Sequence, residues 1–194
     1  MDVFDEDAEP FDLNDEDVES EEDTEDDFDD EDDLEDASED EVDFVVAAYR
    51  EDGQPVVVPL DFDVANDLDE LIRQLSRLPG DSGADGFVSV NQEFFVLCRV
   101  RGRQVEVLLS DVHAAHDWPI ARDVADYLGT DLHDDDESAP LGDLDLFAAS
   151  GLKALELEAI ASDYDTDSDE LVLQVARRLK IGEQFERAVA SFDH

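Results

Sequence analysis

The acidic first 43 residues constrain the fold of this chain more than any other feature. They contain 27 of the 59 acidic residues of the protein, no Lys or Arg, and few apolar side chains. Carboxylate repulsion opposes compaction, and so little apolar surface cannot offset an ordering cost of roughly 1–2 kcal/mol per residue. The composition therefore predicts a disordered tail over residues 1–43. Two interpretations of it stay open, a solvating tail and a segment that folds on a basic partner.

The net charge of −47 excludes several classes of protein. Nucleic-acid binding rests on Lys and Arg neutralising phosphates, so we expect no direct nucleic-acid partner. Anionic membrane surfaces are disfavoured for the same reason. The sequence shows no apolar run of membrane-spanning length and no signal-peptide pattern at its start. We therefore expect a cytoplasmic protein, and its single cysteine, Cys98, excludes an internal disulfide framework and a Cys-rich zinc site.

Residues 44–129 show the hydrophobic patterns of a small sheet domain with two helices. Two prolines, Pro55 and Pro59, lack amide donors and place the second strand at an edge or make it short. Pro119 predicts a break in the second helix, and Gly129 predicts its end. Periodicity predicts strands over 44–50, 55–60, 87–90, 93–101 and 104–110, and helices over 66–78 and 111–128.

The C-terminal part is predicted to be helical after an acidic loop at 130–140. Apolar spacing favours helices over 141–150, 152–162, 168–180 and 183–192. The whole pattern predicts an α+β fold, with a ββαβββα core, a mainly antiparallel sheet and a C-terminal helical cluster. The predicted organisation is a tail over 1–43, a sheet domain over 44–129 and a helical region over 130–194 packed on the same domain.

The search for catalytic chemistry yields exclusions. Nucleobase deaminases need a His/Cys zinc site and a catalytic Glu in an H-x-E…P-C-x-x-C arrangement, which this chain lacks. Phosphate-binding, dinucleotide-binding and serine-hydrolase glycine motifs are also missing from the sequence. Cys98 lies in the middle of an apolar alternation, which favours a buried, inert thiol. We therefore predict no catalytic residue, no cofactor and no metal site, and expect that the protein is not an enzyme.

Two short patterns resemble metal sites but are better explained otherwise. His113 and His116 stand three residues apart beside Asp111, a spacing that allows a shared metal, yet no third ligand is indicated. The segment 163–168 (DYDTDS) resembles the start of a calcium loop, but Ser168 stands where Gly is needed and Gln174 where Glu is needed. We interpret the histidines as exposed and the segment as a helix cap formed by Asp167 or Ser168.

Basic residues gather in two places, 99–103 and 177–180. Arg99 and Arg101 share a strand face, and Gly102 permits a turn after them. Such a group can receive an acidic partner or the acidic tail of the same chain. With so many carboxylates in the chain, pairing of these cations within the molecule is the favoured interpretation.

Read together, four stretches resemble the bacterial family of tRNA adenosine deaminase-associated proteins. They are FVVAAYRED, DLDELIRQLSRLPG, EFFVLCRVRGRQVEVLLSDVHAA and the C-terminal run that begins PLGDLDLFAASGL, and the resemblance covers about residues 44–190. It implies a non-enzymatic accessory protein whose partner is a tRNA adenosine deaminase or another basic protein surface, and it transfers no catalytic residue. The alternative is an unrelated acidic interaction domain or small-ligand-binding domain.

Overall fold

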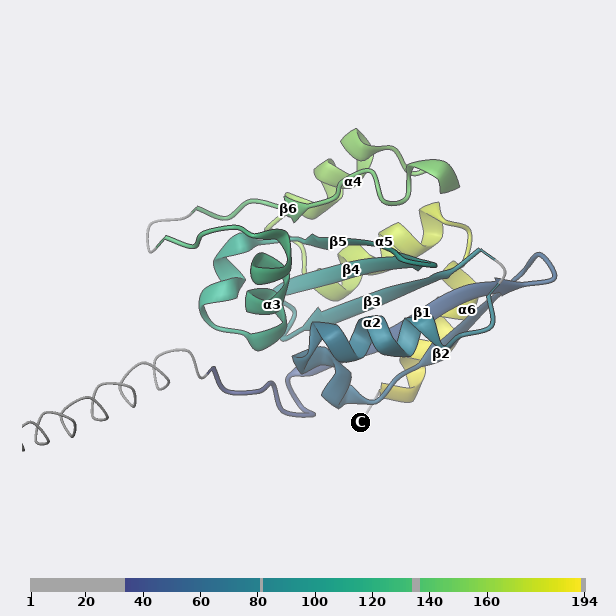
Figure 1. Cartoon of the computed structure of the whole chain (residues 1–194), viewed down its shortest axis with the longest axis horizontal. Helices are drawn as coiled ribbons and strands as arrows, with labels where there is room; N and C mark the ends of the chain where they lie inside the picture. The colour runs from purple at the N-terminus through teal and green to yellow at the C-terminus, as the bar shows by residue number, and fades with distance from the viewer. Residues whose placement is uncertain (1–33, 81, 134–136, 193–194) are drawn as a thin grey trace, which may run out of the picture. The chain divides into compact units, whose positions relative to one another are not determined.

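The described part of the chain is built on one antiparallel sheet. The computed structural model describes residues 34–80, 82–133 and 137–192, which from Glu35 onward form one compact unit. Six strands follow the spatial order β2-β1-β3-β4-β5-β6 (Figure 1). They are β1 (Val42–Glu51), β2 (Gln54–Pro59), β3 (Ala84–Val90), β4 (Phe94–Arg101), β5 (Gln104–Leu109) and β6 (Leu141–Gly142). The predicted α+β class with a mainly antiparallel sheet is confirmed.

Tight turns set the strand order. Between β1 and β2, Asp52 and Gly53 both have positive φ angles, 54° and 80°, which match the natural twist of a two-residue hairpin. Gly102, with φ 59°, serves the turn from β4 to β5. As expected, β2 lies at the edge of the sheet. An edge strand tolerates Pro55 and Pro59, because it has no neighbour on its outer side that needs their missing amide donors.

One face of the sheet is covered by η3 (Phe62–Asn66), α2 (Leu68–Ser76), η4 (Val112–His116) and α3 (Pro119–Leu128). Alternate residues of β4, including Phe94 and Cys98, point into this core, as strand periodicity requires. Gly86 of β3 lets α2 approach closely, because a Cβ there would lie 3.0–3.1 Å from side-chain carbons of Leu75 and Leu71. The helix predicted over 111–128 is interrupted before Pro119, as expected, and Gly129 ends it.

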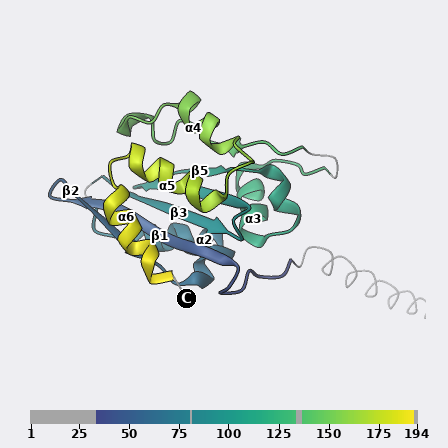
Figure 2. The ribbon, with the colours of Figure 1, turned by 180° about the vertical axis from the view of Figure 1, so that it is seen from behind.

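The opposite face carries η5 (Ala148–Ser150), α4 (Ala154–Ala161), α5 (Ser168–Arg178), α6 (Gly182–Val189) and η6 (Ala190–Phe192), seen from behind in Figure 2. Aromatic rings hold this second core together. Phe185 of α6 meets Phe44 and Phe87 edge-on at 5.3 and 5.4 Å between ring centroids, and Phe147 stacks on Phe87 at 6.0 Å. The sheet is therefore covered on both faces.

The helix predicted over 141–150 is wrong. Residues Leu141–Gly142 instead form β6, paired with the outer edge of β5, and a short 3-10 turn follows at Ala148–Ser150. Gly142 explains the difference, because its φ of 125° lies outside the helical region. The amide of Asp143 then donates to the carbonyl of Val107, which extends the pairing.

The fold begins before the predicted boundary at residue 43. Strand β1 starts at Val42, which is buried, and Ala37 is only 3% exposed. The amide and carbonyl of Ala37 bond the side chain of Asn66 at 2.7 and 3.0 Å. Residues 1–33 of the predicted tail lie outside the described residues. Among the described helices, none is long and apolar enough to cross a membrane.

Candidate functional site: a charged pocket at one end of the sheet

The residues singled out for possible chemistry lie apart from one another. Cys98 is fully buried on β4, and burial raises the pKa of its thiol to about 12, which makes it inert near neutral pH. His113 and His116 lie on η4 with ring centroids 5.5 Å apart. Asp111 beside them accepts hydrogen bonds from the amide of His113 and the hydroxyl of Ser138. This carboxylate therefore organises the loop around it.

The segment 163–168 forms a local turn. Asp163 accepts hydrogen bonds from the amide of Asp165 and the hydroxyl of Thr166. Asp167 occupies the N-cap position of α5, but its side chain makes no capping bond, and Ser168 makes none either. The predicted N-cap position at Asp167 is therefore confirmed, with Asp169 and Glu170 in the first turn of α5, although no side-chain capping bond forms there.

A buried polar chain ties α5 to the sheet. The hydroxyls of Ser89 on β3 and Ser168 on α5 lie 2.7 Å apart, and Ser89 donates to the carboxylate of Asp43 at 2.8 Å. Asp43 also accepts from the amide of Gln92 at 2.7 Å. Burial raises the pKa of Asp43, and these bonds partly oppose the shift. These hydrogen bonds hold the start of α5 over the turn between β3 and β4.

Charged residues form a row across the sheet at its other end. We call this the hairpin end, because the β1–β2 and β4–β5 turns lie there. The register aligns Ala48, Asp85, Arg99 and Glu106 on neighbouring strands, so the three charged side chains share one face. The three charged side chains lie on the face covered by α4, α5 and α6. They are not part of the apolar core beneath these helices.

Arg99 is the centre of this row. It is only 9% exposed and its Nη1 donates to the carbonyl of Leu146 at 3.0 Å and to the hydroxyl of Ser150 at 3.2 Å. Its Nε lies 3.5 Å from the carboxylate of Asp85, and its guanidinium carbon lies 5.6 Å from the ring centroid of Phe147. Arginine tolerates such burial because its planar head can bond several partners at once.

A pocket of about 190 Å³ opens beside Arg99. Burial raises the pKa of Asp85 on its floor to about 6, although Arg99, Arg101 and Arg50 all favour the ionised form. The pocket is lined by residues of β1, β2, β3, β4, the loop before β3, η5 and the α5–α6 junction: Ala48, Tyr49, Arg50, Pro55, Ser82, Gly83, Asp85, Arg99, Ser150, Leu179 and Ile181.

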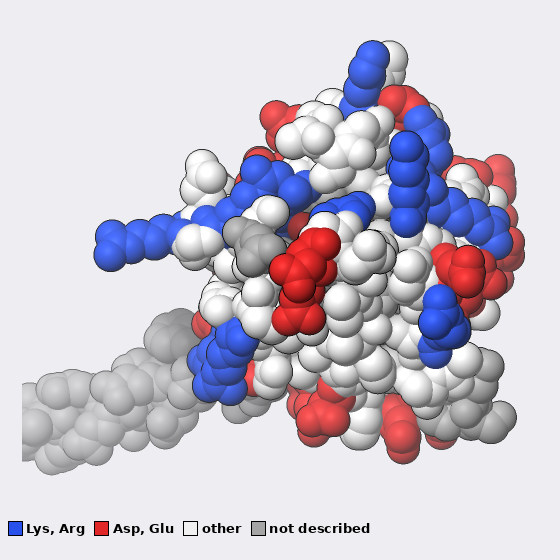
Figure 3. All heavy atoms as spheres, turned by 90° about the vertical axis from the view of Figure 1, so that its right-hand side faces the viewer, with Lys and Arg blue, Asp and Glu red and all other residues white. Residues whose placement is uncertain are grey.

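Basic side chains gather over the hairpin end, as Figure 3 shows for the right-hand side of Figure 1. Several of them pair within the molecule, as the sequence predicts. Arg178 contacts Glu156, and Arg177 lies 3.7 Å from Glu186. The exposed Arg50 and Arg103 have no ion pair among the described residues.

The opposite end of the sheet is acidic. The segments that build it, 34–45, 59–69, 89–95, 109–118 and 161–171, contain no Lys or Arg, although Arg122 of α3 donates to the carbonyl of Ala115 there at 3.1 Å. Burial raises the pKa of Asp43 and of Asp123, and neighbouring carboxylates raise it further. The folded unit therefore has a charge polarity along its strands, which was not visible from the order of residues.

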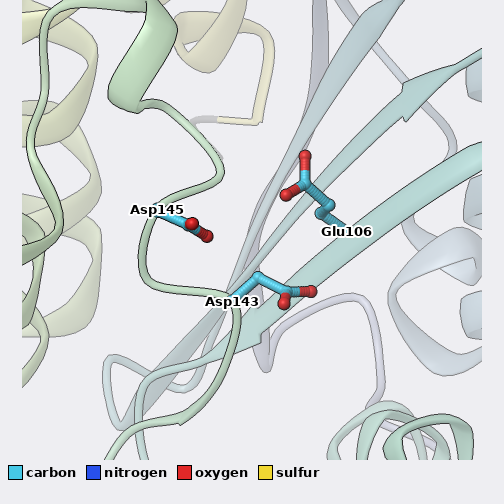
Figure 4. Close-up of side chains that lie close together, drawn as sticks. All are labelled: Glu106, Asp143 and Asp145. Carbon is cyan, nitrogen blue, oxygen red and sulfur yellow. The ribbon is translucent and has the colours of Figure 1, made fainter.

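Glu106 of the charged row and two nearby carboxylates form a group of the kind that holds metals. Glu106 on β5 faces the loop after β6, which carries Asp143 and Asp145 (Figure 4). One oxygen of each lies within 4.8 Å of the others, a spacing suited to a hard cation such as Ca²⁺. The Asp143 carboxylate also accepts the amide of Val107 at 3.2 Å, so it has a structural role in holding β6.

Sequence reasoning found Arg99 and Arg101 but missed the pocket and the carboxylate group. Their members come from strands and loops far apart in the chain, and only strand register brings them together. One signal for the pocket was available in the sequence. Asp85 of β3 and Arg99 of β4 are charged residues at strand positions that face a core.

Comparison of the sequence with known protein families identifies the family of this chain. The family model of Rv3753c-like tRNA adenosine deaminase-associated proteins matches residues 43–182. The chain therefore belongs to the tRNA adenosine deaminase-associated protein family, as its segments suggested.

A curated relative supports this assignment. Protein Rv3753c of Mycobacterium tuberculosis is 30% identical over 150 residues, which span 75% of this chain and 87% of the relative. No solved structure matches the chain.

Proposed function

We propose that this protein is a non-enzymatic accessory protein that binds a tRNA adenosine deaminase. Membership of the family named for association with that enzyme is the observation that carries the proposal. The burial of Cys98 supports a binding role, because this potential nucleophile is closed off from substrate and burial raises the pKa of its thiol to about 12.

Electrostatics supports a basic protein surface as the partner. An enzyme that holds tRNA needs cations to neutralise phosphates, and a chain of net charge −47 complements such a surface. The accessory protein then competes with tRNA for that surface or shields it while tRNA is absent. In this mechanism the protein itself does not bind tRNA.

A groove between α5 and α6 is suited to this contact. It has a volume of about 250 Å³ and an apolar floor that includes Phe44, Leu173 and Val189. Acidic side chains, among them Glu170 and Glu186, lie at its edge. An apolar centre with an acidic rim fits a basic partner that also presents apolar side chains.

The test is a titration of the purified full chain against the tRNA adenosine deaminase of the same organism at low and high salt. We expect binding that weakens as the Debye length falls from about 10 Å to about 3 Å. A double variant, Glu170→Gln with Glu186→Gln, should weaken binding about tenfold, while the control pair Glu51→Gln with Asp52→Asn at the hairpin end should not.

Three results would contradict the proposal or part of it. No binding at low salt would remove the deaminase as partner and favour an unrelated interaction or ligand-binding domain. Binding indifferent to salt would keep the partner and reject the electrostatic mechanism. Equal weakening by both double variants would reject the groove as the contact.

A further inference from the structure

The pocket at the hairpin end has the features of a binding site for an anion. Two of its lining residues, Arg50 and Arg99, carry guanidinium groups, and Lys180 lies between two further lining residues at the α5–α6 junction. Among the described residues that line the pocket, Asp85 is the one carboxylate. The pocket is therefore locally cationic in a chain that is strongly acidic overall.

The donors of these side chains are only partly used. Arg99 spends Nη1 and Nε on Leu146, Ser150 and Asp85, which leaves its Nη2 without a partner among the described residues. Arg50 is exposed and makes one long contact, 3.5 Å, with the carbonyl of Gly53. Both groups retain N–H donors for a ligand.

Hydroxyl groups add to this set of donors. Ser150 lines the pocket and accepts a hydrogen bond from Arg99, so its own O–H is free to donate. Ser82 lines the pocket from the loop before β3. Gly83 in the same loop must be glycine, because its φ is 97° and a Cβ there would lie 2.2 Å from the carbonyl oxygen of Val100. The wall is thus held close against β4.

We propose that this pocket binds a phosphate monoester group, held by Arg50, Arg99 and the hydroxyl of Ser150. A phosphate offers three acceptor oxygens and up to two negative charges. It therefore matches two guanidinium groups and a hydroxyl better than a ligand with a single carboxylate group would. A volume of 190 Å³ exceeds that of a single water several times and admits part of the group attached to the phosphate.

The proposal concerns a site distinct from the α5–α6 groove, so its outcome is independent of deaminase binding. Such a phosphate has two sources, a small phosphorylated molecule and the 5′ end of an RNA. The net charge of the chain repels a long polyanion more strongly than a small ligand, which favours the small molecule.

Phosphorus NMR titration of the full chain with three probes tests the site. The probes are inorganic phosphate, a nucleoside 5′-monophosphate and a short RNA with a 5′-phosphate. We expect saturable binding that Arg50→Gln weakens about tenfold, the usual effect of losing a charge-assisted hydrogen bond. Arg103→Gln removes the same charge from the same end but outside the pocket, and should change the affinity less than about twofold.

A second variant makes the test independent of Arg50. Asp85→Asn removes the pocket carboxylate that competes for Arg99, and should tighten phosphate binding about threefold or more. Tighter binding of the monophosphate identifies a small ligand, and tighter binding of the RNA identifies an RNA end. Absence of saturable binding by all three probes, or equal weakening by Arg50→Gln and Arg103→Gln, would overturn the proposal.

Discussion

At the scale of single residues, Asp85 couples the charge state of the pocket to the stability of the fold. Its carboxyl is buried beside Arg99, and burial raises its pKa from 3.8 to about 6. A carboxyl whose folded pKa is raised contributes stability that is fully present below the unfolded pKa and is lost as pH rises through the folded pKa. The contribution of Asp85 to the free energy of unfolding therefore falls as the pH rises from about 4 to about 6.

Asp85→Asn should remove that dependence, because Asn resembles the protonated acid at every pH. Between pH 5 and pH 7.5 the wild type should lose about 1 kcal/mol more unfolding free energy than the variant does. Urea denaturation at both pH values measures it. Asp52→Asn, an exposed carboxyl on the β1–β2 turn, is the control, and a constant difference for Asp85→Asn would contradict the assignment.

The buried serine pair gives a second prediction at this scale. Ser168→Ala leaves the Ser89 hydroxyl bonded only to Asp43 and removes one buried bond of 2.7 Å. We expect a loss of about 1–3 kcal/mol in unfolding free energy, the cost of breaking a buried hydrogen bond. Ser76→Ala, on the exposed side of α2, should cost less than about 0.5 kcal/mol. Chemical denaturation of both variants would show whether the two costs differ.

At the scale of elements, the predictable parts are those that local chemistry dictates. Pro55 and Pro59 predict an edge or short strand, and Pro119 predicts the break in front of α3. The side chain of Asp67 caps α2 by accepting the amide of Glu70. The pair β5–β6 was missed because Leu141, Leu144 and Phe147 are spaced like a helix, while the deciding feature is the φ of Gly142. The pocket was missed because strand register, not spacing along the chain, assembles it.

Gly142→Ala tests that explanation of β6. A Cβ at this position would lie 2.3 Å from the carbonyl oxygen of Val107, and the φ of 125° is unfavourable for any L residue. We expect a loss of about 2–3 kcal/mol, with faster hydrogen exchange along β5. Gly129→Ala also changes a positive-φ glycine but meets no atom within 4 Å, so it should cost about 1 kcal/mol. Equal costs would reject the close approach as the cause.

At the scale of the whole molecule, the charge is divided between a basic hairpin end, an acidic opposite end and an acidic N-terminal segment. The described fold begins near Ala37, at the acidic end, and the family model begins at residue 43. Residues 1–33 carry no Lys or Arg and no part of the described sheet. Their negative charge should speed encounter with a basic partner.

Two deletions separate this segment from the fold. Removing residues 1–33 should leave the melting temperature within a few degrees of the full chain, because no described core contact is lost. Removing residues 1–43 also deletes buried Ala37 and Val42 and the Asp43 carboxylate that bonds Ser89 and Gln92. This second deletion should lower the melting temperature by about 10 °C, since about 3 kcal/mol of packing and hydrogen bonding is lost. Calorimetry of the two shortened chains measures both effects, and equal melting temperatures would place the start of the fold after residue 43.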